Sequence, residues 1–213
     1  MSTVQAPASQ RLVLYGIDWP TYTRLLRTFA RGPAVRITYD RGVLEIMSPL
    51  LEHESPADLL GRFVVVLTEE LGLPLKAAGS TTLRRKRRKR GLEPDRAWWI
   101  ASEPVMRGKQ QLDLRSDPPP DLAVEIDVAS SSLDRLSIYA ALGVPEVWRC
   151  DGERFHIHVL QSSGEYQEME ASPTFPGIPV AEIVPFLQEN ETRGYLGMIR
   201  AFHEWVRQHL QKS

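Results

Sequence analysis

Apolar positions recur at helical spacing in two segments of the N-terminal half of the chain. The first, over 22–29, follows Asp18 as an N-cap and predicts a short amphipathic helix. The second begins after Ser55-Pro56, and its wide apolar stripe predicts a helix of about 17 residues that lies against a sheet. Between these helices, residues 36–39 and 43–47 are joined by a tight turn and predict a β-hairpin.

Strand patterns predominate from the middle of the chain onward. We expect strands at about 75–83, 94–101, 121–128 and 144–150. A helix that begins after Ser130-Ser131-Ser132 and ends at Gly143 separates the last two of them. This strand, helix, strand order predicts a crossover connection and therefore two parallel strands. The remaining expected elements are a second hairpin (155–160 with 166–169) and two helices within 180–212, broken near Asn190.

These elements predict an α+β fold in which a mixed central β-sheet is flanked by helices. The first hairpin and the C-terminal helices are extra to that sheet. Residues 1–11 are small and polar and show no periodicity, so we expect a flexible N-terminus. No later segment has the length and composition of a linker, which leaves 12–213 as a single domain.

Composition narrows the class of protein. Among 213 residues, 42% are hydrophobic and 26 Lys+Arg nearly balance 27 Asp+Glu, as in an ordinary globular protein. The single cysteine, Cys150, excludes an internal disulfide framework and a Cys-rich zinc site. Apolar runs are too short to span a membrane and no targeting segment is visible, so we expect a cytoplasmic protein without a membrane partner.

The segment 121–128 carries the first sign of chemistry. Side chains of a strand alternate between its faces, so Asp121, Glu125 and Asp127 share one face. Carboxylates in such a row repel one another and resist burial unless a cation compensates them. If the neighbouring strands pair, Asp95 and Glu125 converge on one hard divalent ion. The alternative is a solvated edge strand, which the parallel crossover disfavours.

A dense basic block lies between the strands expected at 75–83 and 94–101. It consists of Arg84, Arg85, Lys86, Arg87, Arg88, Lys89 and Arg90. Seven adjacent cations do not enter a core, so we expect a flexible loop. Such a loop beside the acidic residues is suited to following a phosphate backbone, and a merely solvated loop is the alternative.

Several of these stretches, in this order, resemble a known superfamily. Pro94-Asp95, a strand with Glu125-Ile126-Asp127 and a following helix resemble the PD-(D/E)xK nucleases. The stretches MSPLLEHE, GSTT, GLEPD, PPPDLAVEID and SSSLDRLSIYAALGVPEVWRCDG make the chain similar to the Uma family of restriction-endonuclease-like proteins. The resemblance covers most of residues 40–152 and implies a restriction-endonuclease-like core.

The resemblance also implies roles for individual residues. It makes Asp95 and Glu125 metal-binding acids, with the Ile126 carbonyl as a third ligand. Asp127 stands where the superfamily usually has a lysine, so the third catalytic group departs from the pattern; Asp127 is a candidate metal ligand or base. Arg135, at a position where family members often have a lysine, is a candidate for the missing cation, and a salt bridge at the helix surface is its alternative.

The resemblance further places His53 and Glu54 at a histidine and acidic position typical of the family. An acid at this point also favours the helix dipole without any catalytic role. Asp121, at the beginning of the acidic strand, is either a supporting acid of the site or an ordinary strand residue.

The function implied is a Mg²⁺-dependent endonuclease, with Mn²⁺ as a possible substitute, that hydrolyses DNA phosphodiester bonds. A catalytically silent DNA- or partner-binding module of the same fold is the alternative that the missing lysine permits. A carboxylate-pair glycosidase is a third hypothesis, which no residue pattern specifically supports. We also expect a homodimer, because cutting both strands of a duplex suits two-fold symmetry.

Overall fold

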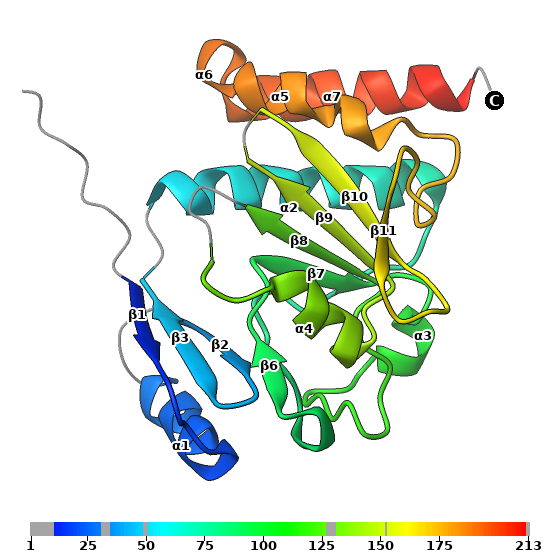
Figure 1. Cartoon of the computed structure of the whole chain (residues 1–213). Helices are drawn as coiled ribbons and strands as arrows, with labels where there is room; N and C mark the ends of the chain where they lie inside the picture. Colours follow the sequence, from blue (N-terminus) through cyan, green and yellow to red (C-terminus); the bar gives the residue numbers. More distant parts are fainter. Residues whose placement is uncertain (1–10, 31–34, 49–50, 127–130, 152, 212–213) are drawn as a thin grey trace, which may run out of the picture.

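The computed structural model of the chain describes residues 11–30, 35–48, 51–126, 131–151 and 153–211, with the backbone alone over 51–55 and 190–191. The helices are α1 (Trp19–Phe29), α2 (Leu51–Leu71), α3 (Glu103–Met106), α4 (Arg135–Leu142), α5 (Val184–Gln188), α6 (Asn190–Arg193) and α7 (Tyr195–Leu210), with short 3-10 turns η1 (Lys86–Arg88) and η2 (Val180–Ile183). Figure 1 shows that they surround two β-sheets.

Sheet A is antiparallel and has the order β1-β3-β2-β6-β5. Its strands are β1 (Arg11–Leu14), β2 (Arg36–Asp40), β3 (Val43–Met47), β5 (Leu83–Arg85) and β6 (Arg90–Leu92). Sheet B has the order β11-β10-β9-β8-β7-β4. Its strands are β4 (Lys76–Ala77), β7 (Arg96–Trp99), β8 (Leu122–Ile126), β9 (Glu146–Cys150), β10 (Phe155–Leu160) and β11 (Tyr166–Met169).

The expected α+β class and its parallel crossover are confirmed. β8 and β9, which α4 connects, pair in parallel, and the other described pairs of sheet B are antiparallel. Both expected hairpins are present as β2–β3 and β10–β11. Asp18 caps α1 as expected, because its carboxylate accepts the N–H of Thr21 at 2.8 Å.

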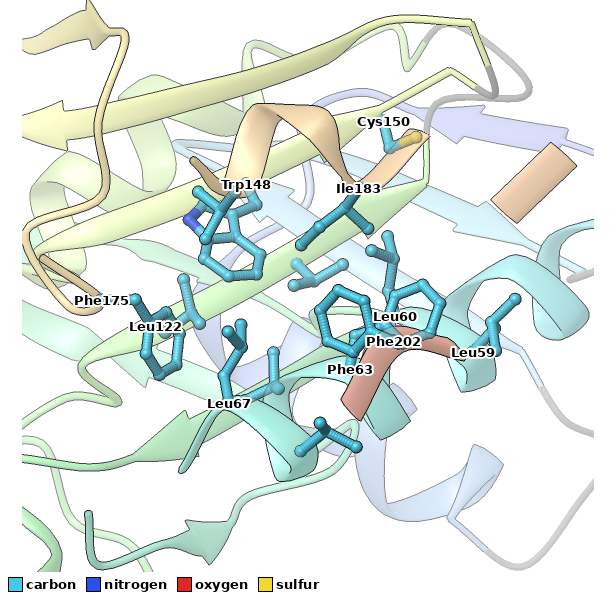
Figure 2. Packing of buried hydrophobic residues seen from close by; sticks show 14 of the residues in the cluster. Leu59, Leu60, Phe63, Leu67, Leu122, Trp148, Cys150, Phe175, Ile183 and Phe202 are labelled. Carbon is cyan, nitrogen blue, oxygen red and sulfur yellow. The ribbon is translucent and has the colours of Figure 1, made fainter. Parts of the chain in front are cut away.

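Alternation along β8 sends its side chains into two different clusters. Leu122, Val124 and Ile126 pack on the face covered by α2 and α7. Ala123 packs on the opposite face, in the cluster under α4. Figure 2 shows Phe63 and Leu67 of α2 gathered with Phe202 of α7 in the first cluster. Because the acid Glu125 alternates with the residues of this core, it is directed to the α4 side of the sheet.

A third cluster lies between α1 and sheet A. Tyr22 of α1 stacks on Tyr39 of β2, with ring centroids 4.6 Å apart, and Ile37 and Leu44 complete its buried part. This cluster covers one face of the β2–β3 hairpin. The hairpin is therefore packed into the molecule by an apolar face of its own, and its polar face is directed elsewhere.

Two expected elements have different limits. The strand expected at 75–83 is divided: β4 belongs to sheet B and β5 to sheet A, since Gly79 at φ +59° turns the chain between the sheets. The helix expected after Ser55-Pro56 begins earlier, at Leu51, and contains Pro56. The expectation used Pro56 as a mark of the helix start, where proline is common, but here Pro56 lies inside the helix, five residues after its beginning.

The ends of the chain largely follow the expectation. Apart from Arg11, which begins β1, the terminus expected to be flexible lies outside the described residues. The C-terminal break near Asn190 is present, with α6 and Gly194 at φ +67° between α5 and α7. Over the described residues, no helix has the length and apolar character of a membrane span.

Replacement of Phe202 by alanine tests the packing of α7 on α2. Its ring is fully buried, 4.1 Å from the ring of Phe63 between centroids. We expect Phe202→Ala to lower the free energy of unfolding by about 3–5 kcal/mol, because it leaves a cavity in the largest cluster. Leu196→Ala, on the same helix but 68% exposed, should change it by less than about 0.5 kcal/mol. Urea unfolding followed by circular dichroism measures both, and equal effects would contradict this packing.

Candidate functional site

Asp95 directly precedes β7, and Glu125 lies on β8, the strand that pairs with β7. The antiparallel register pairs Arg96 with Val124 and Ala97 with Ala123. One step further along the same register, Asp95 faces Glu125, on the sheet face that Ala97 and Ala123 share. Both acids are 5% exposed. The pairing of β7 with β8 brings the two acids to the same end of these strands, and their convergence on one ion stays a prediction.

The carboxylate of Asp95 is held by backbone and by charge. Its Oδ2 accepts the N–H of Ile126 at 2.6 Å, and its other oxygen forms an ion pair with Arg36 of β2. Arg36 is itself 9% exposed. Ile126, expected as a ligand through its carbonyl, is thus joined to Asp95 through its N–H. The bond fixes Asp95 beside the carboxyl end of β8.

The carboxylate of Glu125 receives two side chains of α4. Arg135 donates from Nη2 to Oε1 at 2.5 Å, and the hydroxyl of Tyr139 donates to the same oxygen. The two donors are four residues apart and therefore lie on one face of the helix. Burial raises the pKa of Tyr139 well above its usual value, and the charge of Glu125 raises it further. Tyr139 is consequently a neutral donor to the acid.

Arg135 joins three parts of the molecule. Besides Glu125, it donates to Thr38 Oγ1 of β2 at 2.7 Å and to the carbonyl of Glu93 at 2.9 Å. Burial lowers the pKa of its guanidinium, but the charge of Glu125 and the interactions with Glu125 and Tyr139 together outweigh this, so the pKa lies above its usual value. The alternative of a salt bridge at the helix surface does not describe it, because its side chain is 15% exposed and bonded to two other elements.

Glu93 lies in the short connection between β6 and β7. It accepts the Thr82 hydroxyl at 2.8 Å and the N–H of Ile37 at 3.3 Å. Burial raises the pKa of its carboxyl, although these two donors oppose the rise. Glu93 thus ties the stretch before Asp95 to β2.

Three side chains of the site were not predicted from the sequence: Arg36, Thr38 and Tyr139. The first two alternate with Ile37 and Tyr39, so the period of β2 already indicates a polar face. Tyr139 lies one helical turn after Arg135, which was the available signal for it.

The charges of this site balance. Two buried carboxylates are paired with two arginines, as burial of a charge requires. The carboxylate oxygens of Asp95 and Glu125 are ligands of the kind that hard divalent ions prefer. Within the described ranges no group of three or more acidic, histidine or cysteine side chains is placed to hold a metal ion. The donor chemistry fits a hard ion, which would compete with the arginines for the carboxylate oxygens.

Other expected residues are placed less completely. Asp127 lies outside the described residues, and His53 and Glu54 lie in the first turn of α2, where only the backbone is described. Asp121 supports the chain elsewhere: its carboxylate accepts the N–H groups of Ile100 at 2.6 Å and Ser102 at 2.8 Å. These bonds lie at the beginning of β8, at the far end of the strand from Glu125.

The expectation that the basic block is a flexible loop is wrong. It forms a hairpin in which β5 and β6 pair through Arg84, Arg85 and Arg90, and η1 makes the tip. The reason is that apolar Leu83 and Leu92 at its base are fully buried and hold the strands together. The basic hairpin, residues 84–90, is thus an ordered part of sheet A.

The cations of the basic hairpin divide into two groups. Arg90 donates to Asp40 Oδ1 at 2.8 Å and to the carbonyl of Ser137 in α4 at 2.6 Å. Arg85 is also half-buried. The exposed members are Arg84, Lys86, Arg87, Arg88 and Lys89. Lys89 precedes Asp95 by six residues, which limits their separation to about 20 Å.

Comparisons with known proteins bear on this site. The model of the Uma2 family, described as "Putative restriction endonuclease", matches residues 19–191. A solved structure, "a putative nuclease belonging to DUF820 from Anabaena variabilis ATCC 29413", has 13% sequence identity and a TM-score of 0.48, over 82% of this chain and 92% of that chain. Among curated proteins no match was found. The family match covers well over half of the chain and includes Asp95, Glu125 and Arg135, so the chain belongs to the Uma2 family.

Proposed function

We propose that the protein is a divalent-metal-dependent endonuclease that hydrolyses DNA phosphodiester bonds. The observation that carries this proposal is the burial of two acids at one end of paired strands, Asp95 just before β7 and Glu125 on β8. Burial of each carboxylate is costly and is offset here by an arginine beside it. The family description supports the same class of activity.

Asp95 and Glu125 are the side chains that would hold Mg²⁺ or Mn²⁺, with the carbonyl of Ile126 and the carboxylate of Asp127 as further oxygen donors. Such an ion lowers the pKa of a bound water and neutralises charge on the phosphate oxygens. Asp127 replaces the usual lysine, so we assign it to metal binding or to removal of a proton from the attacking water. His53 and Glu54, in the first turn of α2, are proposed to assist the same step.

Arg135 and Tyr139 act on Glu125. Both donate to its Oε1, so they hold the carboxylate in one orientation. Arg135 remains protonated and cannot serve as a base; it supplies the fixed positive charge near the acids. Because its other bonds go to Thr38 and Glu93, this charge is anchored rather than mobile.

The basic hairpin is proposed to bind the DNA backbone. Only residues 91–94 separate the hairpin from Asp95 along the chain. A phosphate chain that follows the exposed cations of the hairpin therefore comes near the acids. Phosphate contacts of this kind position a duplex without reading its sequence.

A catalytically silent DNA-binding module is the second candidate. The balanced pairs Arg36–Asp95 and Arg135–Glu125 favour it, since the acids are stable here without a metal ion. Asp127 in place of a lysine is consistent with the same view. The two candidates differ in whether the acids are needed for cleavage.

Substitution of the acids tests the nuclease. We expect Asp95→Asn and Glu125→Gln each to reduce cleavage of duplex DNA in Mg²⁺ by on the order of 1,000-fold, because each removes a charged ligand of the ion. Chelation by EDTA should abolish cleavage by the unaltered protein. A plasmid cleavage assay at low salt measures these rates.

Asp121→Asn is the matched control, since it removes a carboxylate from the other end of the same strand. It should retain cleavage in a preparation whose folding is verified by circular dichroism. Full activity of Asp95→Asn and Glu125→Gln, or cleavage that persists in EDTA, would contradict the proposed chemistry.

Neutralisation of the hairpin tip tests DNA binding. Arg87→Gln combined with Arg88→Gln should weaken binding to duplex DNA and flatten the plot of log K against log salt by about 0.9 for each phosphate that is no longer neutralised. The pair Arg27→Gln and Arg200→Gln, exposed on α1 and α7, removes the same charge elsewhere. Fluorescence anisotropy at several salt concentrations compares the two variants. Equal slopes for both would remove the hairpin from the binding surface.

A further inference from the structure

The polar face of the β2–β3 hairpin lies against the candidate site. Arg36, Thr38 and Asp40 alternate along β2, and the register places Glu45 of β3 opposite Thr38 on the same face. The other face is the apolar one that packs under α1. Each of these four polar side chains contacts a segment outside the hairpin.

Glu45 binds the segment that leads into α4. Its Oε2 accepts the N–H of Ser132 at 2.9 Å and the Ser132 hydroxyl at 2.6 Å. Its Oε1 accepts the Ser131 hydroxyl at 2.8 Å. The side chain is buried, with 4% of its surface exposed, and Arg11 of β1 is 3.9 Å away. Glu45 is therefore a buried acid whose contacts with these serines join sheet A to a segment more than 80 residues later in the chain.

The electrostatic state of Glu45 agrees with these contacts. Burial raises the pKa of its carboxyl, but the hydrogen bonds from Ser132 and Ser131 outweigh this effect, and the pKa lies below its usual value. Glu45 is thus ionised at neutral pH, and bonds to a charged acceptor are stronger than neutral ones.

Thr38 and Glu45 hold the two ends of one short stretch. Thr38 accepts a bond from Arg135, and Glu45 binds Ser131 and Ser132. This stretch is the described part of the connection from β8, which carries Glu125, to α4, which carries Arg135. Neighbouring side chains of one hairpin therefore fix where α4 begins relative to the acids.

We propose that Glu45 is a positioning residue of the site. It acts through Ser131 and Ser132 to place Arg135 on Glu125. The β2–β3 hairpin therefore helps to position the side chains of the site. This inference rests on the proposed nuclease function, whose acids Glu45 does not touch. It assigns to sheet A the role of fixing the cation that accompanies Glu125.

Three variants test the proposal. Glu45→Ala removes every acceptor for the serines. Glu45→Gln keeps one carbonyl oxygen of the same shape and should rescue part of the effect. Glu146→Gln is the matched control, because Glu146 is an equally buried acid that accepts the Thr174 N–H at 3.0 Å and its hydroxyl at 2.6 Å, away from the acids.

Amide hydrogen exchange and cleavage kinetics are measured for each variant. In Glu45→Ala, we expect exchange at residues 132–135 to accelerate by about tenfold or more, since a charged acceptor is removed. We expect kcat to fall about 10- to 100-fold through misplacement of the site, with the KM for DNA nearly unchanged. Glu146→Gln should leave exchange at 132–135 and kcat unaltered.

The outcomes separate this inference from the proposed function. Exchange and kcat that are unchanged in Glu45→Ala, or a loss in Glu146→Gln that equals it, would overturn the positioning role while the nuclease stands. Failure of the unaltered protein to cleave any duplex would instead overturn the proposed function, and the inference with it.

Discussion

Burial of two carboxylates at the end of β7 and β8 is the constraint on which the site depends. A carboxylate removed from water is stable only with a cation or strong donors beside it, and here each acid has an arginine. The two arginines come from different parts of the chain, Arg36 from sheet A and Arg135 from α4. Sheet A must therefore pack against sheet B for the acids to remain in place.

The same pairs determine how the site relates to a metal ion. A divalent ion bound as proposed would compete with the two guanidinium groups for the carboxylate oxygens, so its affinity would reflect an exchange of cations. Arg135 is held by Thr38 and Glu93 as well as by Glu125, which keeps positive charge near the acids. Charge fixed in this way would be preorganised for the proposed hydrolysis of a phosphodiester bond.

The sequence was sufficient to predict the elements whose signals are local. The parallel crossover and both hairpins follow from alternation, turn and capping signals. The resemblance to a family singled out Asp95 and Glu125, whose role as metal ligands stays a prediction. The partners of the acids were less accessible, because Arg36 and Thr38 reach Asp95 and Arg135 only through the packing of two sheets. The basic hairpin was expected as a loop, since its charge obscured the buried residues Leu83 and Leu92 at its base.

The central claim is that Asp95 and Glu125 bind a divalent ion in spite of their arginines. Titration of the unaltered protein with Mn²⁺, followed by electron paramagnetic resonance in the absence of DNA, tests it most directly. The account predicts saturable binding that is lost in both Asp95→Asn and Glu125→Gln. Absence of saturable binding, or binding that both substitutions leave intact, would contradict it.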